Sequence, residues 1–134
     1  MEIYRRKVTN SILQAIMDVE AKTRTEQISK MDYLINFNKI MEDYDTVLNV
    51  LMSQSTGNFK LKKSTYQPSE FDSQVFDNII KSIYETTPQK GDRGEIIEQA
   101  EYVLNLNRIM LDYPNVIKTL IQWQNKESKG DIDF

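Results

Sequence analysis

Arg24 to Leu51 reads RTEQISKMDYLINFNKIMEDYDTVLNVL, and Arg93 to Leu120 reads RGEIIEQAEYVLNLNRIMLDYPNVIKTL. Aligned at a constant offset of 69, the two segments share twelve identical residues out of 28, and most other pairs are alike in chemistry. A segment that occurs twice predicts a structural unit that occurs twice. The repeat therefore decides the fold expected for the chain before any single residue is interpreted.

The similarity extends upstream of these segments, at an offset of 67. The matched apolar residues there are Val8, Ile12 and Ile16 in the first copy and Val75, Ile79 and Ile83 in the second. The two extra residues of the second copy fall near residues 88–92, which predicts a loop there. Each copy reads as a short helix, a tight turn and a longer helix. We therefore predict an all-α fold of two tandem helical hairpins, related by duplication and packed as a four-helix bundle-like array.

The predicted boundaries follow from composition. Residues 1–52 form the first hairpin, 53–68 a basic polar linker, 69–125 the second hairpin and 126–134 a flexible tail. Proline inside a helix removes a hydrogen bond and clashes with the preceding turn. We therefore expect a kink or a helix restart next to Pro114.

Both long helices begin with the same pattern of polar residues. Thr23 is followed three residues later by Glu26, and Asp92 by Glu95. Each pair fits a capping box. In this motif the first side chain accepts from the backbone N–H of the third helical residue, and the carboxylate of that residue accepts from the backbone N–H of the first. Ser69, after Pro68, is a further candidate N-cap.

Apolar residues recur at helical spacing along one face of each long helix and predict the core. The first copy contributes Tyr33, Leu34, Phe37, Ile40, Met41, Tyr44, Val47, Leu48 and Leu51, and the second contributes Tyr102, Val103, Leu106, Ile109, Met110, Tyr113, Val116, Ile117 and Leu120. A second apolar face lies opposite the first and comprises Ile28, Met31 and Ile35, with Ile97, Ala100 and Leu104 in the second copy. A helix that is apolar on two sides is expected to be buried on two sides, here by the other repeat or by another chain, as in a homodimer.

Cysteine and histidine are both absent from the sequence. Their absence excludes disulfides, thiolate or imidazole metal ligands and the commonest general base. No glycine-rich phosphate loop or nucleophile-elbow motif is present either. We therefore expect a protein that is not an enzyme and holds no metal or cofactor. The short apolar runs predict no membrane span, and without a signal-peptide pattern the expected location is cytoplasmic.

The net charge of −3 conceals an asymmetry, because residues 1–67 carry +2 and residues 68–134 carry −5. Two short basic clusters stand out, Arg5-Arg6-Lys7 and the linker lysines Lys60, Lys62 and Lys63. Basic residues beside aromatic ones can bind nucleic acid, so a nucleic-acid-binding regulator is one hypothesis.

Polar residues that recur in both copies are the strongest candidates for a role. They are Arg24/Arg93, Glu26/Glu95, Asn36/Asn105, Asn38/Asn107, Lys39/Arg108 and Asp43/Asp112. Asparagine is a mediocre helix former, so its recurrence needs a reason. One interpretation is hydrogen bonding that fixes helix register, and the other is a polar site between the copies.

The leading hypothesis is a non-enzymatic protein–protein interaction module, an adaptor, inhibitor or immunity-type factor that acts by steric masking. Its candidate partner-binding residues are Tyr33, Asn38, Tyr44, Lys60, Lys62, Lys63, Tyr102, Asn107, Tyr113 and Trp123. A third hypothesis is a small-ligand sequestering protein with a pocket between the repeats, lined by Asn38, Asn107, Tyr44 and Tyr113. Tyrosine in a core stripe also fits a purely structural role with its hydroxyl at a wet edge.

Overall fold

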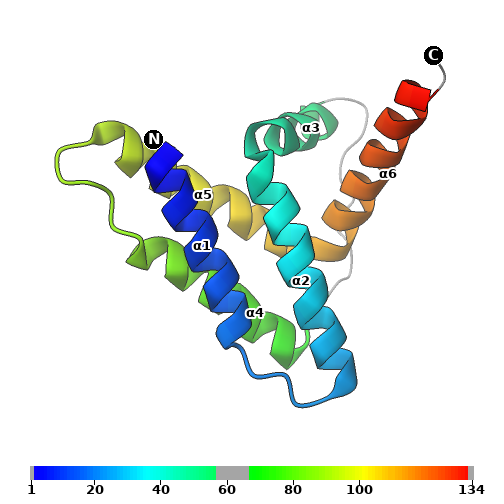
Figure 1. Cartoon of the computed structure of the whole chain (residues 1–134), viewed down its shortest axis with the longest axis horizontal. Helices are drawn as coiled ribbons and strands as arrows, with labels where there is room; N and C mark the ends of the chain where they lie inside the picture. The colour runs from blue at the N-terminus through cyan, green and yellow to red at the C-terminus, as the bar shows by residue number, and fades with distance from the viewer. Residues whose placement is uncertain (1, 57–66, 133–134) are drawn as a thin grey trace.

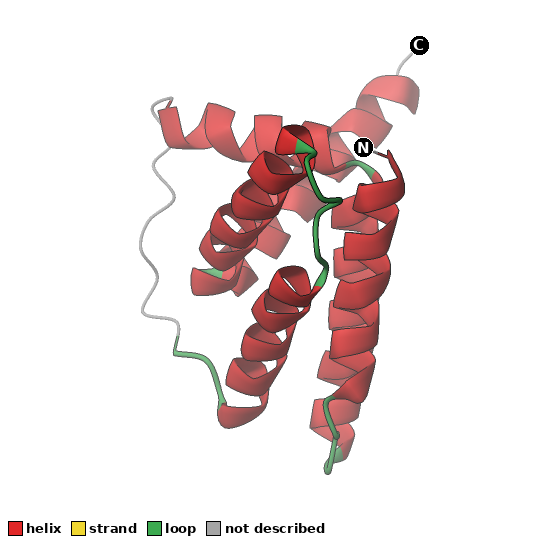
Figure 2. Ribbon diagram, turned by 90° about the vertical axis from the view of Figure 1, so that its left-hand side faces the viewer, coloured by secondary structure: helices red, strands yellow, loops and turns green. Residues whose placement is uncertain are grey.

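The chain folds into helices that pack as a bundle. A computed structural model of the protein describes residues 2–56 and 67–132, and no strand occurs within these ranges. The helices are α1 (Glu2–Asp18), α2 (Arg24–Glu42), α3 (Tyr44–Thr56), α4 (Glu70–Glu85), α5 (Arg93–Leu111) and α6 (Tyr113–Ile132) (Figure 1). Short loops at the helix ends connect them wherever the connection is described (Figure 2). The predicted all-α class is therefore confirmed.

Helices α1 and α4 form the centre of the bundle, with α2 packed on α1 and α5 packed on α4 (Figure 1). The two central helices run in opposite directions. The Tyr4 hydroxyl, near the start of α1, donates to the carbonyl of Thr86 just beyond the end of α4, at 3.2 Å. Nearer the other end of α1, the Asn78 side chain donates to the carbonyl of Ala15 at 3.3 Å.

The core is built from the apolar stripes that the sequence predicts. The fully buried residues at the α1–α4 contact include Val8, Ile12, Ile16, Val75, Ile79 and Ile83. Tyr33, Phe37 and Ile40 of α2 and Tyr102, Leu106 and Ile109 of α5 close the core from either side. Each buried isoleucine contributes about 1.5–3 kcal/mol relative to exposure, so this cluster is the main source of stability.

The helix starts agree closely with the predicted caps. Thr23 accepts from the backbone N–H of Glu26, whose carboxylate accepts from the backbone N–H of Thr23, so this capping box is confirmed. Ser69 and Asp72 form a second box at the start of α4. At the start of α5, Asp92 accepts from the backbone N–H of Glu95 at 3.2 Å.

The carboxylate of Glu95 departs from the predicted box. It accepts from the backbone N–H of Gln89 at 3.2 Å, which lies in the loop before the helix, and Glu95 is buried. The loop turns back at Gly91, whose φ of 89° is one that glycine adopts without strain. This local geometry brings residue 89 to the carboxylate, so Glu95 fixes the loop as well as the helix start.

Each predicted long helix is divided in two by a single residue. Helix α2 ends at Glu42 and α3 begins at Tyr44, while α5 ends at Leu111 and α6 begins at Tyr113. The intervening aspartates have non-helical backbone angles, with φ −129° and ψ 47° at Asp43 and φ −139° and ψ 49° at Asp112. Helix α6 begins one residue before Pro114, and a break of the same kind occurs at Asp43, where Asp45 stands in place of the proline. A proline is therefore not needed for a break of this kind.

Two boundary predictions concern segments at the edges of the described structure. Of the predicted linker 53–68, residues 53–56 belong to α3 and residues 57–66 lie outside the described residues. Helix α6 continues to Ile132, through most of the predicted tail 126–134. The backbone of residues 126–132 is thus helical, and the flexibility of the tail stays a prediction.

Candidate functional site

Helix α2 presents an exposed apolar stripe to solvent. Ile28 is 56% exposed, Met31 57% and Ile35 49%. Arg24 and Asn38 extend the same helix face, one turn before and one turn after these residues, and both are exposed. We call the face formed by residues 24, 28, 31, 35 and 38 the α2 stripe. It is the second apolar face identified in the sequence, and the described parts of the chain do not bury it.

Helix α5 presents the equivalent face. Ile97 is 58% exposed and Leu104 is 63% exposed, with the exposed Ala100 between them. Arg93 and Asn107 again occupy the two ends. Residues 93, 97, 100, 104 and 107 form the α5 stripe. Every member lies 69 positions after a member of the α2 stripe and keeps its chemical type.

Charged residues beside the stripes are matched as well. Asp32 and Glu101 flank the middle of the two stripes, and Lys39 and Arg108 follow the two asparagines. All four side chains are exposed. Each stripe therefore carries a cation at both ends and a carboxylate beside its centre.

The expectation that the second repeat covers these faces is wrong for the described structure. Helices α2 and α5 use their opposite faces, through Tyr33, Phe37, Tyr102 and Leu106, to reach the core. Contiguous exposed apolar side chains on a small domain mark interaction sites, because water otherwise contacts surface that a partner could bury. Coverage by another chain stays a prediction.

The predicted tyrosines lie inside the molecule, where they join the two halves reciprocally. Tyr44 contacts Tyr102 with a ring-centroid separation of 4.7 Å, and Tyr113 contacts Tyr33 with the same separation. The Asn105 side chain donates to the Tyr44 hydroxyl at 3.1 Å. The Asn36 side chain donates to the Tyr113 hydroxyl at 3.0 Å.

These contacts support the structural interpretation of one asparagine pair. Asn36 of α2 holds Tyr113 at the start of α6. Asn105 of α5 holds Tyr44 at the start of α3. Tyr33, Tyr44 and Tyr102 are buried, so a partner could not touch their rings in this conformation, and Tyr113 is half-buried.

The remaining predicted residues are placed differently. Asn38 and Asn107 are exposed at the ends of the two stripes and do not meet Tyr44 or Tyr113, which are bonded to the other asparagine pair. Trp123 is half-buried in α6. The three linker lysines Lys60, Lys62 and Lys63 lie outside the described residues. Of the predicted partner-binding set, Asn38 and Asn107 therefore lie on the matched exposed faces.

The N-terminal basic cluster is partly engaged within the chain. The Arg5 guanidinium donates to both carboxylate oxygens of Asp45, at 3.0 and 3.2 Å, and lies 3.8 Å from Glu98. Burial raises the pKa of Glu98, and Arg5 opposes the shift. A guanidinium held by two carboxylates is less available to a phosphate, which weakens the nucleic-acid hypothesis for this cluster.

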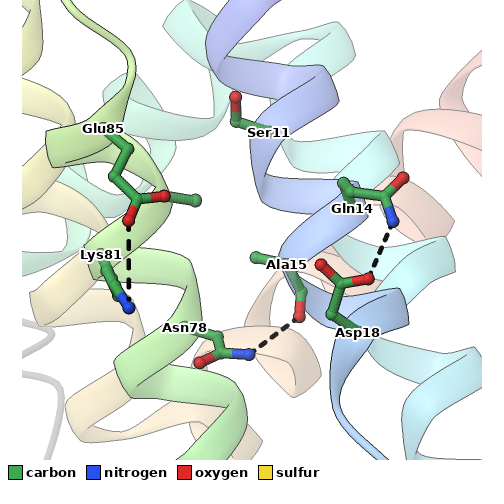
Figure 3. Close-up of a pocket in the computed structure, with 8 residues that line it drawn as sticks. Ser11, Gln14, Ala15, Asp18, Asn78, Lys81 and Glu85 are labelled. Atoms are coloured by element: carbon green, nitrogen blue, oxygen red, sulfur yellow. Dashed lines mark hydrogen bonds and ion pairs between the residues drawn. The ribbon is translucent and has the colours of Figure 1, made fainter.

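A polar groove of about 300 Å³ lies between α1 and α4. Figure 3 shows Ser11, Gln14, Ala15 and Asp18 on one side and Asn78, Lys81 and Glu85 on the other. Its polar groups bond to one another, since Gln14 donates to Asp18 at 2.9 Å and Lys81 lies 3.9 Å from Glu85. This groove does not contain the residues of the predicted ligand pocket.

Neither a metal site nor a membrane-spanning helix occurs among the described residues. No three acidic side chains in this part of the chain gather closely enough to hold a metal ion. Among the described helices, none combines the length and the hydropathy needed to cross a membrane.

Comparisons with protein-family models, with curated proteins and with solved structures found no match for this chain.

Three buried tyrosines predict sensitivity to alkaline pH. Burial raises the pKa of the Tyr4 hydroxyl to about 12, with Glu95 and Glu98 adding to the shift, and burial also raises the pKa of Tyr44 and Tyr102. In the unfolded chain a tyrosine ionises near its ordinary value of about 10. The unfolded state therefore loses these protons first, and stability present below pH 10 is lost as the pH rises towards 12.

We expect the free energy of unfolding, measured by urea denaturation, to fall between pH 10 and pH 12. Tyr4→Phe removes one of the hydroxyl groups that ionise in this window. The free energy of unfolding should then fall less steeply with pH, by up to about 1.4 kcal/mol per pH unit. The same slope in both proteins across this window would contradict the assignment of Tyr4.

Proposed function

We propose that this protein is a non-enzymatic protein–protein interaction module whose contact surfaces are the α2 and α5 stripes. The observation that carries the proposal is the recurrence of one exposed face on two helices. Exposed positions tolerate substitution, because changes there usually alter stability by less than about 0.5 kcal/mol. Folding alone gives no reason to keep isoleucine at both Ile28 and Ile97, which water contacts in this structure.

We further propose that the two halves derive from one ancestral helical unit. The support is the shared sequence together with the order of the helices. Helices α2 and α5 each span 19 residues, and a single residue separates each from the next helix. The reciprocal tyrosine–asparagine contacts fit the same origin. In the second half, Pro114 then reinforces a break that the aspartate already permits.

The mechanism we propose is steric masking. A partner segment lying along a stripe buries Ile28, Met31 and Ile35 and loses access to its other ligands, as with an adaptor or an inhibitor. Burial of these three side chains removes apolar surface from water. Each Å² removed contributes about 25 cal/mol, which supplies the favourable free energy of binding. No covalent chemistry is required, in keeping with a sequence that lacks cysteine and histidine.

The proposal is tested by comparing three baits. The double substitution Ile28→Ser with Ile97→Ser places a hydroxyl in each stripe. Met17→Ser is the matched control, since Met17 is 55% exposed on α1, a helix that carries neither stripe. Immobilised wild-type and variant proteins are incubated with extract of the cells that make the chain, and captured proteins are quantified by mass spectrometry.

We expect at least one protein to be captured by the wild type and by Met17→Ser. Its capture should fall about tenfold or more on the double variant, because anchoring apolar residues at interfaces contribute more than about 1 kcal/mol each. Circular dichroism should show unchanged helix content for all three. Equal capture on every bait, or none on any, would contradict the proposed function.

A further inference from the structure

We infer that each stripe receives one amphipathic helix with carboxylates at both ends of its apolar face, so that one chain binds two copies of the same helix. The inference rests on the proposed function and specifies its partner. Three features of the stripes carry it: their spacing, their charges and their recurrence.

The spacing fits a helix in the partner. Apolar residues of the α2 stripe stand at positions 28, 31 and 35, the three-and-four spacing of adjacent helix turns. A helix laid along α2 presents side chains at the same period, whereas a strand with its period of two does not. From Arg24 to Lys39 the face extends fifteen residues, which is about 22 Å at 1.5 Å per residue.

The charges specify the ends of that helix. Arg24 and Lys39 bound the α2 stripe, and Arg93 and Arg108 bound the α5 stripe. None of the four forms an ion pair within the described parts of the chain. Carboxylates at both ends of the incoming apolar face would pair with them, and a central lysine would pair with Asp32 or Glu101.

The same charges oppose pairing between copies of this chain. In an antiparallel contact centred on Met31, Arg24 of one copy lies next to Lys39 of the other. Packing α2 against α5 of a second copy brings Arg24 next to Arg108 in the same way. A parallel contact sets each cation beside its own counterpart. Because like charges that face each other are unfavourable, a second copy fits the stripes poorly.

The recurrence specifies two identical helices. The stripes match in chemical type at all five positions, three of which are identical, and in the flanking charges at positions 32/101 and 39/108. Exposed positions nearby differ, with Gln27 against Ile96 beside the stripes and Glu42 against Leu111 on the next turn of the same helix face. Two surfaces with one pattern fit one ligand, and a homodimeric partner presents such a ligand twice.

A synthetic peptide of eighteen residues provides the probe. It carries leucine along one helix face, glutamate at both ends of that face and one lysine beside its centre. A second peptide has the same leucines with lysine and glutamate exchanged. Binding of each to the full chain is measured by isothermal titration calorimetry, and the isoleucine methyl signals of the protein are followed by NMR.

We expect two equivalent sites for the peptide with acidic ends and at least tenfold weaker binding of the exchanged peptide. The methyl signals of Ile28 and Ile97 should shift together while that of Ile79 does not. A variant with Arg24→Glu, Lys39→Glu, Arg93→Glu and Arg108→Glu should prefer the exchanged peptide. All four positions are exposed, so the variant should fold.

Equal affinity for the two peptides would overturn the charge assignment, and a single site would overturn the twofold stoichiometry. Light scattering that showed a dimer of the free chain, with the stripes protected, would assign them to a second copy. If neither peptide binds but the capture experiment loses its partner on the double variant, the inference fails and the proposed function stands. Failure of the capture experiment overturns the proposed function itself.

Discussion

Ile79→Ala is expected to lower the free energy of unfolding by about 3–4 kcal/mol, the largest effect of any single substitution considered for this protein. Ile79 is fully buried on α4, where that helix packs against α1. Removing three carbon atoms from a closely packed site loses their transfer free energy and leaves a cavity that the neighbouring helices fill only in part. Urea denaturation followed by circular dichroism measures the change.

Two variants show whether the effect comes from this contact. Ile12 is the matched residue on α1 and is also fully buried, so Ile12→Ala should cost a similar amount. Ile121→Ala removes the same atoms from a side chain that is 50% exposed and should change stability by less than about 0.5 kcal/mol. A cost below about 1 kcal/mol for both buried positions would show that α1 and α4 are not the centre of the core.

Tyr33→Phe is expected to destabilise the protein by about 1.5 kcal/mol, whereas Tyr102→Phe should leave stability unchanged or raise it slightly. The two tyrosines are equivalent in the repeat, and both are buried. The Tyr33 hydroxyl donates to the Asp72 carboxylate at 2.6 Å, so its loss removes a hydrogen bond to a charged group. The Tyr102 hydroxyl is buried without a hydrogen-bond partner among the described residues.

The difference has a simple origin in the sequence. The residue of α1 that corresponds to Asp72 is Arg5, which is turned towards Asp45 at 3.0 Å. Removing a buried polar atom that lacks a partner also removes its desolvation penalty. Thermal and urea denaturation of the two variants provide the measurement. Equal destabilisation by both substitutions would contradict the assignment of these two hydroxyl environments.

Local sequence patterns were sufficient to predict where α2, α4 and α5 begin. The Thr23 and Ser69 caps depend on residues within one turn. The core-facing side of α2, which contains Phe37 and Ile40, depends on the helical period. These are short-range properties, so they can be identified without knowing how helices pack. The Glu95 carboxylate was predicted to bond to its own cap and bonds instead to Gln89, because the preceding loop turns back at Gly91.

The break at Asp43 could not be predicted from the sequence, because no proline or glycine lies next to it. The break at Asp112 lies two residues before Pro114, but the matching break without a proline shows that proline is not its only cause. The break at Asp43 lets Tyr44 reach Asn105 and Tyr102 in the other half. Such a contact depends on how the two halves of the chain are placed relative to each other. The helical period of one segment does not predict that placement.

The exposure of the second apolar face could not be obtained from the sequence for the same reason. Periodicity shows that Ile28, Met31 and Ile35 share a face, but not whether another helix of the chain covers them. The structure leaves them exposed. Asn38 and Asn107 belong to the candidate site because they lie at the ends of these exposed faces. The sequence had instead suggested that they line a pocket with Tyr44 and Tyr113.

Both stripes must be uncovered in the free chain if a partner is to bind them. Isoleucine methyl NMR with a soluble paramagnetic agent measures this, because the agent broadens signals of side chains that solvent can reach. We predict strong broadening for Ile28, Ile35 and Ile97, comparable to that of the exposed Ile3, and little for Ile12, Ile40, Ile79 and Ile109. Protection of Ile28 and Ile97 to the level of Ile79 would mean that both stripes are already covered, and would contradict the proposed function.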